Sequence, residues 1–377
     1  MSRPTVEAGK EWLRRTRIYS LRNRWNARSS GARIMEPHGY LQPGTCDHTF
    51  VVVCGGAFDQ SVPNAATMCR MGWCHGFEAL GIPYLLASAY DLERVFAEVP
   101  NPICWITESD YHYLDASGLQ ALSRQPHAVL VDTWFDGETA YYRSRGFPNV
   151  SSPDWHRARL LSTEPRFLFT ISPASRLDYY YGWSRTGMSV NSIPLACDLA
   201  LYGDPILSGQ FADVEMGFVG GFWPYKARQF DVYLKPHARR MTVFGYSAWP
   251  YGQYGGQLSL EHEPELYAQA KVSPVINEPH VCAMGVDINE RVFKVLGAGG
   301  LAITDACAGY RDWFSADELL VPESPDEFHE LIAAALREDP ALSGLRERGR
   351  QAVLARHTYR HRAESFLALM YPKGGYK

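Results

Sequence analysis

A polar stretch leads into an amphipathic one in "DINERVFKVLGAGGLAITD", residues 287–305. The apolar spacing predicts a helix that ends at glycines and passes directly into a strand. The first turn of a helix offers free N–H groups and partial positive charge, which favour a bound phosphate. Arg291 would add a fork of donors suited to a diphosphate. We therefore expect Asn289, Glu290 and Arg291 to form an anion site.

A second cluster of candidate anion-binding residues follows the stretch "EMGFVGGFW", residues 215–223, which reads as a strand closed by a glycine turn. Lys226 and Arg228 come next, in the predicted first turn of a helix. Alternatively, these two side chains are ordinary surface charges without a ligand. Together these cations would neutralise a diphosphate without a metal ion. The other candidate contacts to the same ligand are Gly220, Gly221, Gly245, Glu278, His280, Lys294 and Gly299.

Carboxylates that could remove a proton from a hydroxyl group lie at strand ends in the first half of the chain. Asp59 follows the glycine turn in "CGGAFDQS", and Glu108 and Asp110 follow a strand in "WITESDYHY". A catalytic base must reach the hydroxyl that it deprotonates. In α/β folds with parallel sheets, ligands bind at the carboxyl ends of the strands, so residues there can serve as the base. The alternative for each residue is a helix N-cap or a turn.

The elements that would position these groups alternate between apolar β-branched runs and amphipathic stretches, which predicts α/β structure. This alternation is interrupted near residues 201–215 by glycine, proline and aspartate, and we interpret the segment as a linker. We expect two doubly wound, Rossmann-like domains facing across a cleft. The predicted division is a basic segment at 1–47, an acceptor domain at 48–205, a donor domain at 206–357, and a helix at 358–377 that packs back on the first domain.

Composition narrows the class of protein. The eight cysteines among 377 residues form no C-x-x-C pair, which favours reduced thiols over a zinc site or a disulfide framework. No run of eighteen apolar residues and no secretion signal is apparent, so we expect a cytoplasmic protein. Residues 1–34 carry a net charge of +7 in a chain of net charge -4. This segment either is a solvated arm or binds an anionic partner such as nucleic acid.

From about residue 215 to its end, the sequence resembles the C-terminal domain of GT-B glycosyltransferases, and most closely the CgeB-like branch. The matching stretches are "FVGG", "VFGYSAW", "YAQAKVSPVIN", "NERVFKVLGAGGLAITD", "LLVPESPDEFHELI" and "GRQAVLARHTYRHR". This resemblance implies a GT-B fold with a nucleotide-sugar donor, UDP- or GDP-linked, as co-substrate and no other cofactor. It also implies a reaction without a bound divalent ion, and no D-x-D stands in a suitable loop.

One position departs from the pattern of the family. A glutamate that holds the ribose hydroxyls commonly stands where this chain has Lys294, and its partner eight residues upstream would fall on Val286. A lysine cannot accept a hydroxyl proton. Either Glu290, Asp287 or Glu278 holds the ribose, or the donor lies differently.

The expected function is transfer of a sugar from a nucleoside diphosphate to a hydroxyl acceptor: a polysaccharide, a protein, a small molecule or a modified DNA base. A phage-type enzyme acting on hydroxymethylated bases is one alternative, since the basic segment and the loop aromatics at 178–184 and 246–256 suit nucleic acid or sugars. A non-catalytic sugar- or nucleotide-binding protein of the same fold is another. An epimerase with two similar domains is a third.

Overall fold

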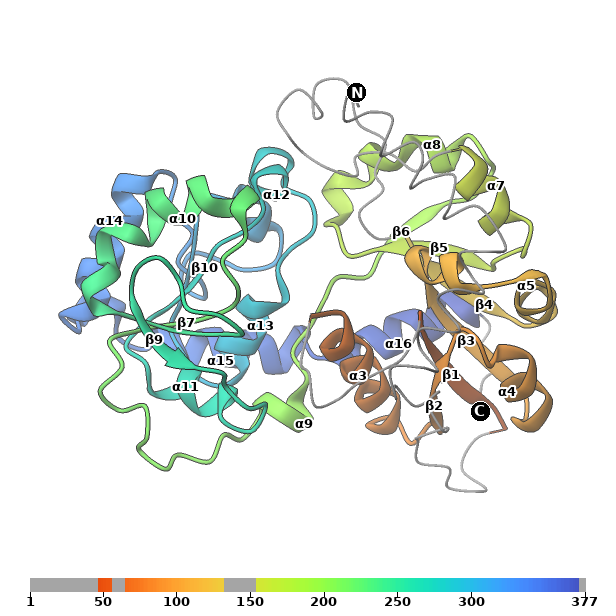
Figure 1. The fold of residues 1–377 in the computed structure, drawn as a ribbon, viewed down its shortest axis with the longest axis horizontal. Helices are drawn as coiled ribbons and strands as arrows, with labels where there is room; N and C mark the ends of the chain where they lie inside the picture. Colours follow the sequence, from red (N-terminus) through yellow and green to blue (C-terminus); the bar gives the residue numbers. More distant parts are fainter. Residues whose placement is uncertain (1–46, 56–64, 132–153, 373–377) are drawn as a thin grey trace.

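The computed structural model describes residues 47–55, 65–131 and 154–372. The chain forms two α/β lobes side by side, joined near α9 (Figure 1). The first has the strands β1 (Thr49–Cys54), β2 (Tyr84–Ser88), β3 (Pro102–Thr107), β4 (His127–Leu130), β5 (Phe167–Thr170) and β6 (Val190–Ser192). Its helices are α3 (Ala65–Glu78), α4 (Leu92–Glu98), η1 (Glu108–Tyr113), α5 (Ala116–Ser123), α7 (Asp154–Leu161), η2 (Ala174–Tyr180), α8 (Tyr181–Ser184) and α9 (Leu199–Tyr202).

The second lobe contains β7 (Met216–Val219), β8 (Met241–Phe244), β9 (Gln253–Gly256), β10 (Ser273–Val275) and β11 (Ala302–Thr304). Its first helices are η3 (Pro224–Lys226), α10 (Ala227–Tyr233), η4 (Lys235–Arg240), α11 (Glu263–Gln269), α12 (Pro279–Met284) and α13 (Glu290–Gly297). The remaining helices are η5 (Ala308–Asp312), α14 (Pro325–Leu336), η6 (Pro340–Leu342), α15 (Leu345–Arg356) and α16 (Tyr359–Met370).

Each lobe has a parallel sheet whose strand order reverses once. The first sheet runs β2-β1-β3-β4-β5-β6, so the reversal lies between β1 and β3. In the second lobe β7, β8 and β9 pair in parallel, and a bridge between Met216 and Val272 places β10 and β11 on the other side of β7. Ligands of doubly wound folds bind at the carboxyl ends of strands beside such reversals. The predicted architecture of two doubly wound lobes is confirmed.

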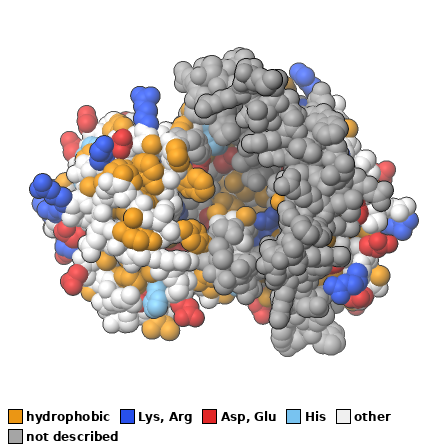
Figure 2. Space-filling model, viewed as in Figure 1, with side chains coloured by type: hydrophobic (Ala, Val, Ile, Leu, Met, Phe, Trp, Pro, Cys, Tyr) orange, Lys and Arg blue, Asp and Glu red, His pale blue; other side chains and the backbone are white. Residues whose placement is uncertain are grey.

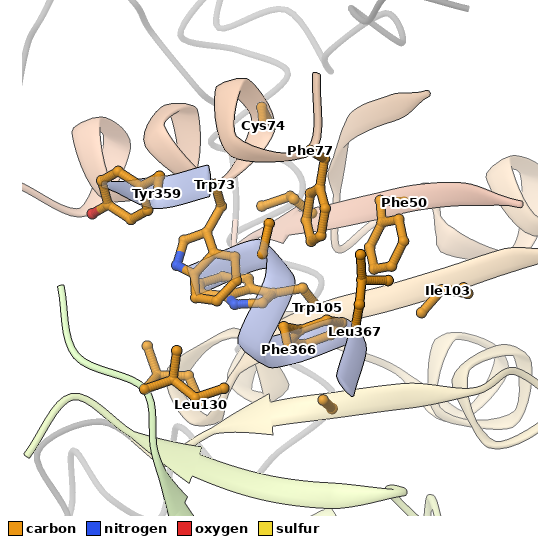
Figure 3. Packing of buried hydrophobic residues seen from close by; sticks show 14 of the residues in the cluster. Phe50, Trp73, Cys74, Phe77, Ile103, Trp105, Leu130, Tyr359, Phe366 and Leu367 are labelled. Carbon is orange, nitrogen blue, oxygen red and sulfur yellow. The ribbon is translucent and has the colours of Figure 1, made fainter. Parts of the chain in front are cut away.

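The last helix crosses from the second lobe to the first (Figure 1). Its Tyr359, Phe366 and Leu367 join Trp73 and Phe77 of α3 in one buried cluster under the first sheet (Figure 3). Glycines 72 and 76 permit this contact, because a Cβ at either position would lie within 2.5 Å of Tyr359. The chain end therefore completes the core of the first lobe.

Some predicted elements are shorter than the sequence pattern indicates. The sequence pattern of residues 340–357 predicts one helix, but the structure divides it into η6 and α15 at Gly344, which has a φ of 73°. The apolar run within residues 318–324 predicts a strand, but the structure has only a single bridge there, between Ile303 and Leu320. Both segments are amphipathic, and a turn conformation that suits only glycine is invisible to hydrophobic periodicity.

Candidate active site

Two glycine-containing loops lie in contact at the carboxyl ends of β7 and β8. The Gly220 N–H donates to the Phe244 carbonyl (2.8 Å), and the Gly220 carbonyl accepts from the Trp249 indole (3.0 Å). A Cβ at Gly245 would lie 2.7 Å from the Gly220 oxygen, and Gly220 itself has a φ of 153°. Side chains are thus excluded from both positions, and the Gly245 N–H donates in turn to the Gly256 carbonyl (3.0 Å).

Arg291 reaches toward this pair of loops from α13. Asn289 caps the helix by accepting from the Arg291 N–H (2.9 Å), which fixes the start of α13. The guanidinium lies over the Phe218 ring at 4.7 Å, and its Nη2 is 3.2 Å from where a Cβ at Gly220 would be. Its Nη1 is buried and has no hydrogen-bond partner among the described residues. This cation thus lies beside a glycine turn and forms no ion pair with any residue that the structure describes.

Lys226 lies at the reversal between β7 and β10. Its buried ammonium donates to the Ile276 carbonyl (3.1 Å) and pairs with Glu278 (2.7 Å), which precedes α12. Burial opposes ionisation of Glu278, but the charge and hydrogen bond of Lys226 outweigh it and lower the pKa of this carboxyl. Lys226 and Glu278 therefore form an internal ion pair that brings the two sides of the crevice together.

The other predicted donor contacts have varied positions. Arg228 is exposed in the first turn of α10, and Gly221 follows Gly220 in the glycine loop. His280 is buried in α12, and its burial lowers the pKa of the imidazole. Gly299 lies beyond the C-terminal end of α13, with a φ of 80°. The structure thus does not bring Gly299 to the end of α13 that carries Arg291.

Glu290 and Lys294 form a buried ion pair across one turn of α13 (2.9 Å). The same carboxylate accepts from the Tyr359 hydroxyl of α16 (2.7 Å) and from the Cys69 thiol of α3 (3.4 Å). The Lys294 ammonium also lies over the Tyr202 ring at 5.4 Å. Burial disfavours the charge, but Glu290 holds the pKa of Lys294 above its ordinary value. Both side chains are thus engaged where the two lobes meet.

The carboxylate of Asp110 is occupied by protein donors. It accepts from the Thr107 N–H (3.0 Å) and hydroxyl (2.7 Å) in the capping box that begins η1. The Arg70 guanidinium bonds to both of its oxygens (3.0 and 3.1 Å). Glu108, in the first turn of the same η1, is fully buried. Asp59, the third predicted base, lies outside the described residues.

The lobes touch through the loops that follow β5 and α12. Ser172 donates to Asp287 (2.8 Å), and Met284 and Val286 pack into a core cluster of the first lobe. Between the lobes the surface is hollowed, and hydrophobic side chains gather on the second lobe beside the hollow (Figure 2). Trp223 and Tyr246, on the loops after β7 and β8, are 61% and 57% exposed. The sequence pattern of residues 246–256 indicates aromatic loop residues, but it does not show that Tyr246 is exposed while Trp249 is buried.

Among residues 47–55, 65–131 and 154–372, no group of three or more His, Cys, Asp or Glu side chains is arranged to hold a metal ion. None of the helices described is long and apolar enough to cross a membrane. The predicted metal-independence concerns the reaction and stays a prediction.

Comparison with known proteins identifies the second lobe. Residues 228–368 match the family described as glycosyl transferase-like. Among curated proteins, no sequence matches this chain significantly. The family match covers α10 to most of α16, and so includes Arg291 and the helix that carries it.

Solved structures with similar folds cover both lobes. The T4 phage β-glucosyltransferase in complex with its UDP-glucose substrate is 10% identical, with a TM-score of 0.56, over 86% of this chain and 99% of that one. Anabaena HepE in complex with UDP and glucose is 10% identical, with a TM-score of 0.57 and the same coverage. Trehalose 6-phosphate synthase from Burkholderia multivorans is 10% identical, with a TM-score of 0.54, over 87% and 99%. Residues 228–368 thus match the glycosyl transferase-like family, and the chain shares the GT-B fold of these structures.

Proposed function

We propose that this glycosyltransferase moves a sugar from a nucleoside diphosphate to a hydroxyl acceptor, with the donor bound by the second lobe. The diphosphate would lie between Arg291 and the backbone N–H of Gly221, since the N–H of Gly220 already donates to the Phe244 carbonyl. Arg228 is exposed in the first turn of α10, seven residues after Gly221, and would add a second cation. Preset positive charge at this point stabilises the leaving diphosphate as its negative charge grows.

The observation that carries the proposal is the uncompensated Arg291 guanidinium. A partly buried cation with an unused N–H group is unfavourable unless a ligand completes it. The Phe218 ring fixes the plane of the guanidinium, and the missing side chain at Gly220 leaves space for an anion to reach it. Lys226 shapes the crevice from within, because its ammonium already pairs with Glu278.

The acceptor hydroxyl would be deprotonated by a carboxylate of the first lobe. Asp110 is the least suited of the three candidates, since Arg70 and Thr107 already hold its oxygens. Asp59 and Glu108 stay as the proposed bases; Glu108 directly follows β3, beside the reversal between β1 and β3. Trp223 and Tyr246 would offer flat surfaces for a sugar ring or a base.

Thermal shift and calorimetry with UDP- and GDP-sugars test the donor. Free ligand at a hundred times its Kd should stabilise the protein by about 2.7 kcal/mol. Arg291→Ala should abolish this stabilisation, and Arg291→Lys should restore only part of it, because a lysine lacks the planar fork. Arg124→Ala, at an exposed arginine of the first lobe, serves as the control. Unchanged affinity in Arg291→Ala would remove this residue from the site.

Metal-independence and localisation belong to the same proposal. Turnover should persist in excess EDTA, because cations of the protein neutralise the diphosphate. A structure of the similar T4 phage enzyme contains UDP and Mn²⁺. Loss of activity in EDTA would therefore contradict metal-independence. The cysteines described are all free thiols, as expected for a cytoplasmic protein.

Two narrower alternatives have specific support. Lys294, at the position where related enzymes hold the ribose, favours a non-catalytic nucleotide-binding protein; any donor hydrolysis that Arg291→Ala removes would exclude it. The +7 charge of residues 1–34 favours a modified DNA base as the acceptor. Transfer to hydroxymethylated DNA that weakens with salt, and is lost when those residues are removed, would support that acceptor.

A further inference from the structure

A cavity of about 560 Å³ opens on the second lobe between η4 and the C-terminal end of α14. Five of its lining residues have basic or imidazole side chains, and no lining residue is acidic. The residues that line it are Lys235, Pro236, His237, Ala238, Arg239, Arg240, Ala333, Leu336 and Arg337. The cavity is therefore built for a negative ligand.

This cavity is separate from the proposed donor site. Its η4 wall ends at Arg240, and β8 begins at the next residue, Met241, so the cavity lies at the amino ends of the strands. The loops at Gly220 and Gly245 lie at the carboxyl ends of the same strands. In a parallel sheet these are opposite edges, so one ligand of nucleotide size does not occupy both.

Two of the cations have no counter-charge. Lys235 pairs with Asp231 (3.5 Å) and Arg240 with Glu215 (3.4 Å), both at exposed positions where an ion pair contributes little. The side chains of Arg239 and Arg337 are exposed and make no ion pair or hydrogen bond within the part of the chain that the structure describes. Arg337 is the C-cap of α14 and Arg239 lies in the last turn of η4, so helix ends favour both cations, but neither has an ion pair among the described residues.

One lining residue of the cavity, His237, is paired with a second imidazole, that of His329 in α14. His237 Nε2 lies 2.8 Å from His329 Nδ1, so one ring donates and the other accepts. Burial lowers the pKa of His237 to about 4, and His329 and Arg240 add to this effect. The imidazole is thus neutral near pH 7, and the positive charge of the cavity comes from the lysine and the arginines.

We propose that this cavity is a second anion site, which binds a phosphate-bearing group through Arg239 and Arg337. Guanidinium groups match phosphate oxygens with pairs of N–H donors, and two guanidinium groups at one cavity suit a group with several such oxygens. The phosphate belongs to a ligand other than the donor sugar nucleotide. It is either a free anion or a phosphodiester of an acceptor polymer.

Pyrophosphate is the probe, and its binding is measured by calorimetry in an Arg291→Ala background, which removes the proposed donor contact. We expect saturable binding there that weakens with salt. Arg239→Gln combined with Arg337→Gln should weaken it at least tenfold. The matched control is Arg124→Gln with Arg185→Gln, which removes the same charge from exposed positions of the first lobe and should leave the affinity unchanged.

A short single-stranded oligonucleotide, offered as a competitor, distinguishes the two sources of the phosphate. Displacement of pyrophosphate in the wild type, lost in the Arg239/Arg337 variant, assigns the site to a phosphodiester polymer; failure to compete assigns it to a free anion. Equal loss of affinity in the control pair would overturn the proposal, as would the absence of saturable binding at millimolar pyrophosphate. Circular dichroism of each variant confirms that the fold is kept.

Discussion

At the scale of single residues, the candidate carboxylates differ in what surrounds them. Asp110 begins η1 as part of a capping box and holds the buried Arg70. Glu108, two residues earlier, is buried without a role in that cap. The first turn of η1 thus contains one carboxylate with a structural function and one that is a candidate for chemistry.

Substitution separates these two roles. Asp110→Asn should destabilise the protein by about 3 kcal/mol, because it leaves the Arg70 guanidinium buried beside a neutral group. Glu108→Gln should instead lower turnover by a factor of about 100 and leave donor affinity unchanged, as expected on loss of a general base. Urea unfolding and steady-state kinetics measure the two effects. A normal rate in Glu108→Gln leaves Asp59 as the base.

Local sequence is enough to propose a ligand contact for Arg291, but it does not reveal the long-range contacts of the neighbouring residues. A cation in the first turn of a helix calls for a partner, and this follows from local physics alone. Glu290 and Lys294 were also expected at the ligand, but Glu290 accepts from Tyr359 and Cys69, which lie 69 and 221 residues away in the sequence. Contacts of that range depend on how the lobes assemble. The spacing of four residues between Glu290 and Lys294 is the local feature that predicts their ion pair.

At the scale of elements, α16 shows what periodicity omits. Its apolar face predicts a helix, and the structure shows which surface that face covers: α3 and the first sheet. Phe366 contacts Phe50, Trp73 and Phe77 at ring-centroid distances of 5.6, 5.7 and 5.9 Å. A helix at the end of the chain is therefore part of the core of the first lobe.

Removing that ring should be costly. Phe366→Ala should destabilise the protein by about 3–5 kcal/mol, through lost burial and the cavity left behind. Leu369→Ala, on the exposed side of the same helix, should change the free energy of unfolding by less than about 0.5 kcal/mol. Urea unfolding measures both. Similar values for the two variants would show that α16 is not packed as described.

The contact of α3 with α9 gives the protein a pH dependence. His75 Nδ1 lies 2.8 Å from Asp198, the N-cap of α9. Burial opposes protonation of His75, but the hydrogen bond and charge of Asp198 outweigh it and raise the pKa of the imidazole. The unfolded pKa is about 6.5. The stabilisation is thus complete below that pH and is lost as pH rises through the higher folded value.

His75→Gln should therefore lower the Tm most at pH 5.5–6 and progressively less toward pH 8.5. At acidic pH we expect a cost of about 1 kcal/mol, as for a hydrogen bond to a charged group. His262→Gln, at an exposed histidine of the second lobe, controls for general effects of losing an imidazole. A Tm difference that does not vary with pH would contradict the assigned charge state.

At the scale of the whole molecule, the two lobes share their interiors. Met284 and Val286 of the second lobe lie in a core cluster of the first, and α16 leaves the second lobe to complete another. Between them, Ser172 and Asp287 form a buried hydrogen bond, and Asp287 adopts a φ of 50° to make it. The crevice is thus framed by shared packing, and we expect both lobes to unfold in one transition.

The hydrogen bond from Tyr359 to Glu290 tests this coupling, because it joins α16, packed on the first lobe, to the helix that carries Arg291. Tyr359→Phe removes one donor from a buried carboxylate and should destabilise the protein by about 1–3 kcal/mol. Tyr267→Phe is the matched control: a buried tyrosine that donates to Glu263 within one helix, at 2.8 Å. Both should lower the urea midpoint, but only Tyr359→Phe should also weaken donor binding, since it frees the start of α13. Equal donor affinity in the two variants would mean that the placement of Arg291 does not depend on the first lobe.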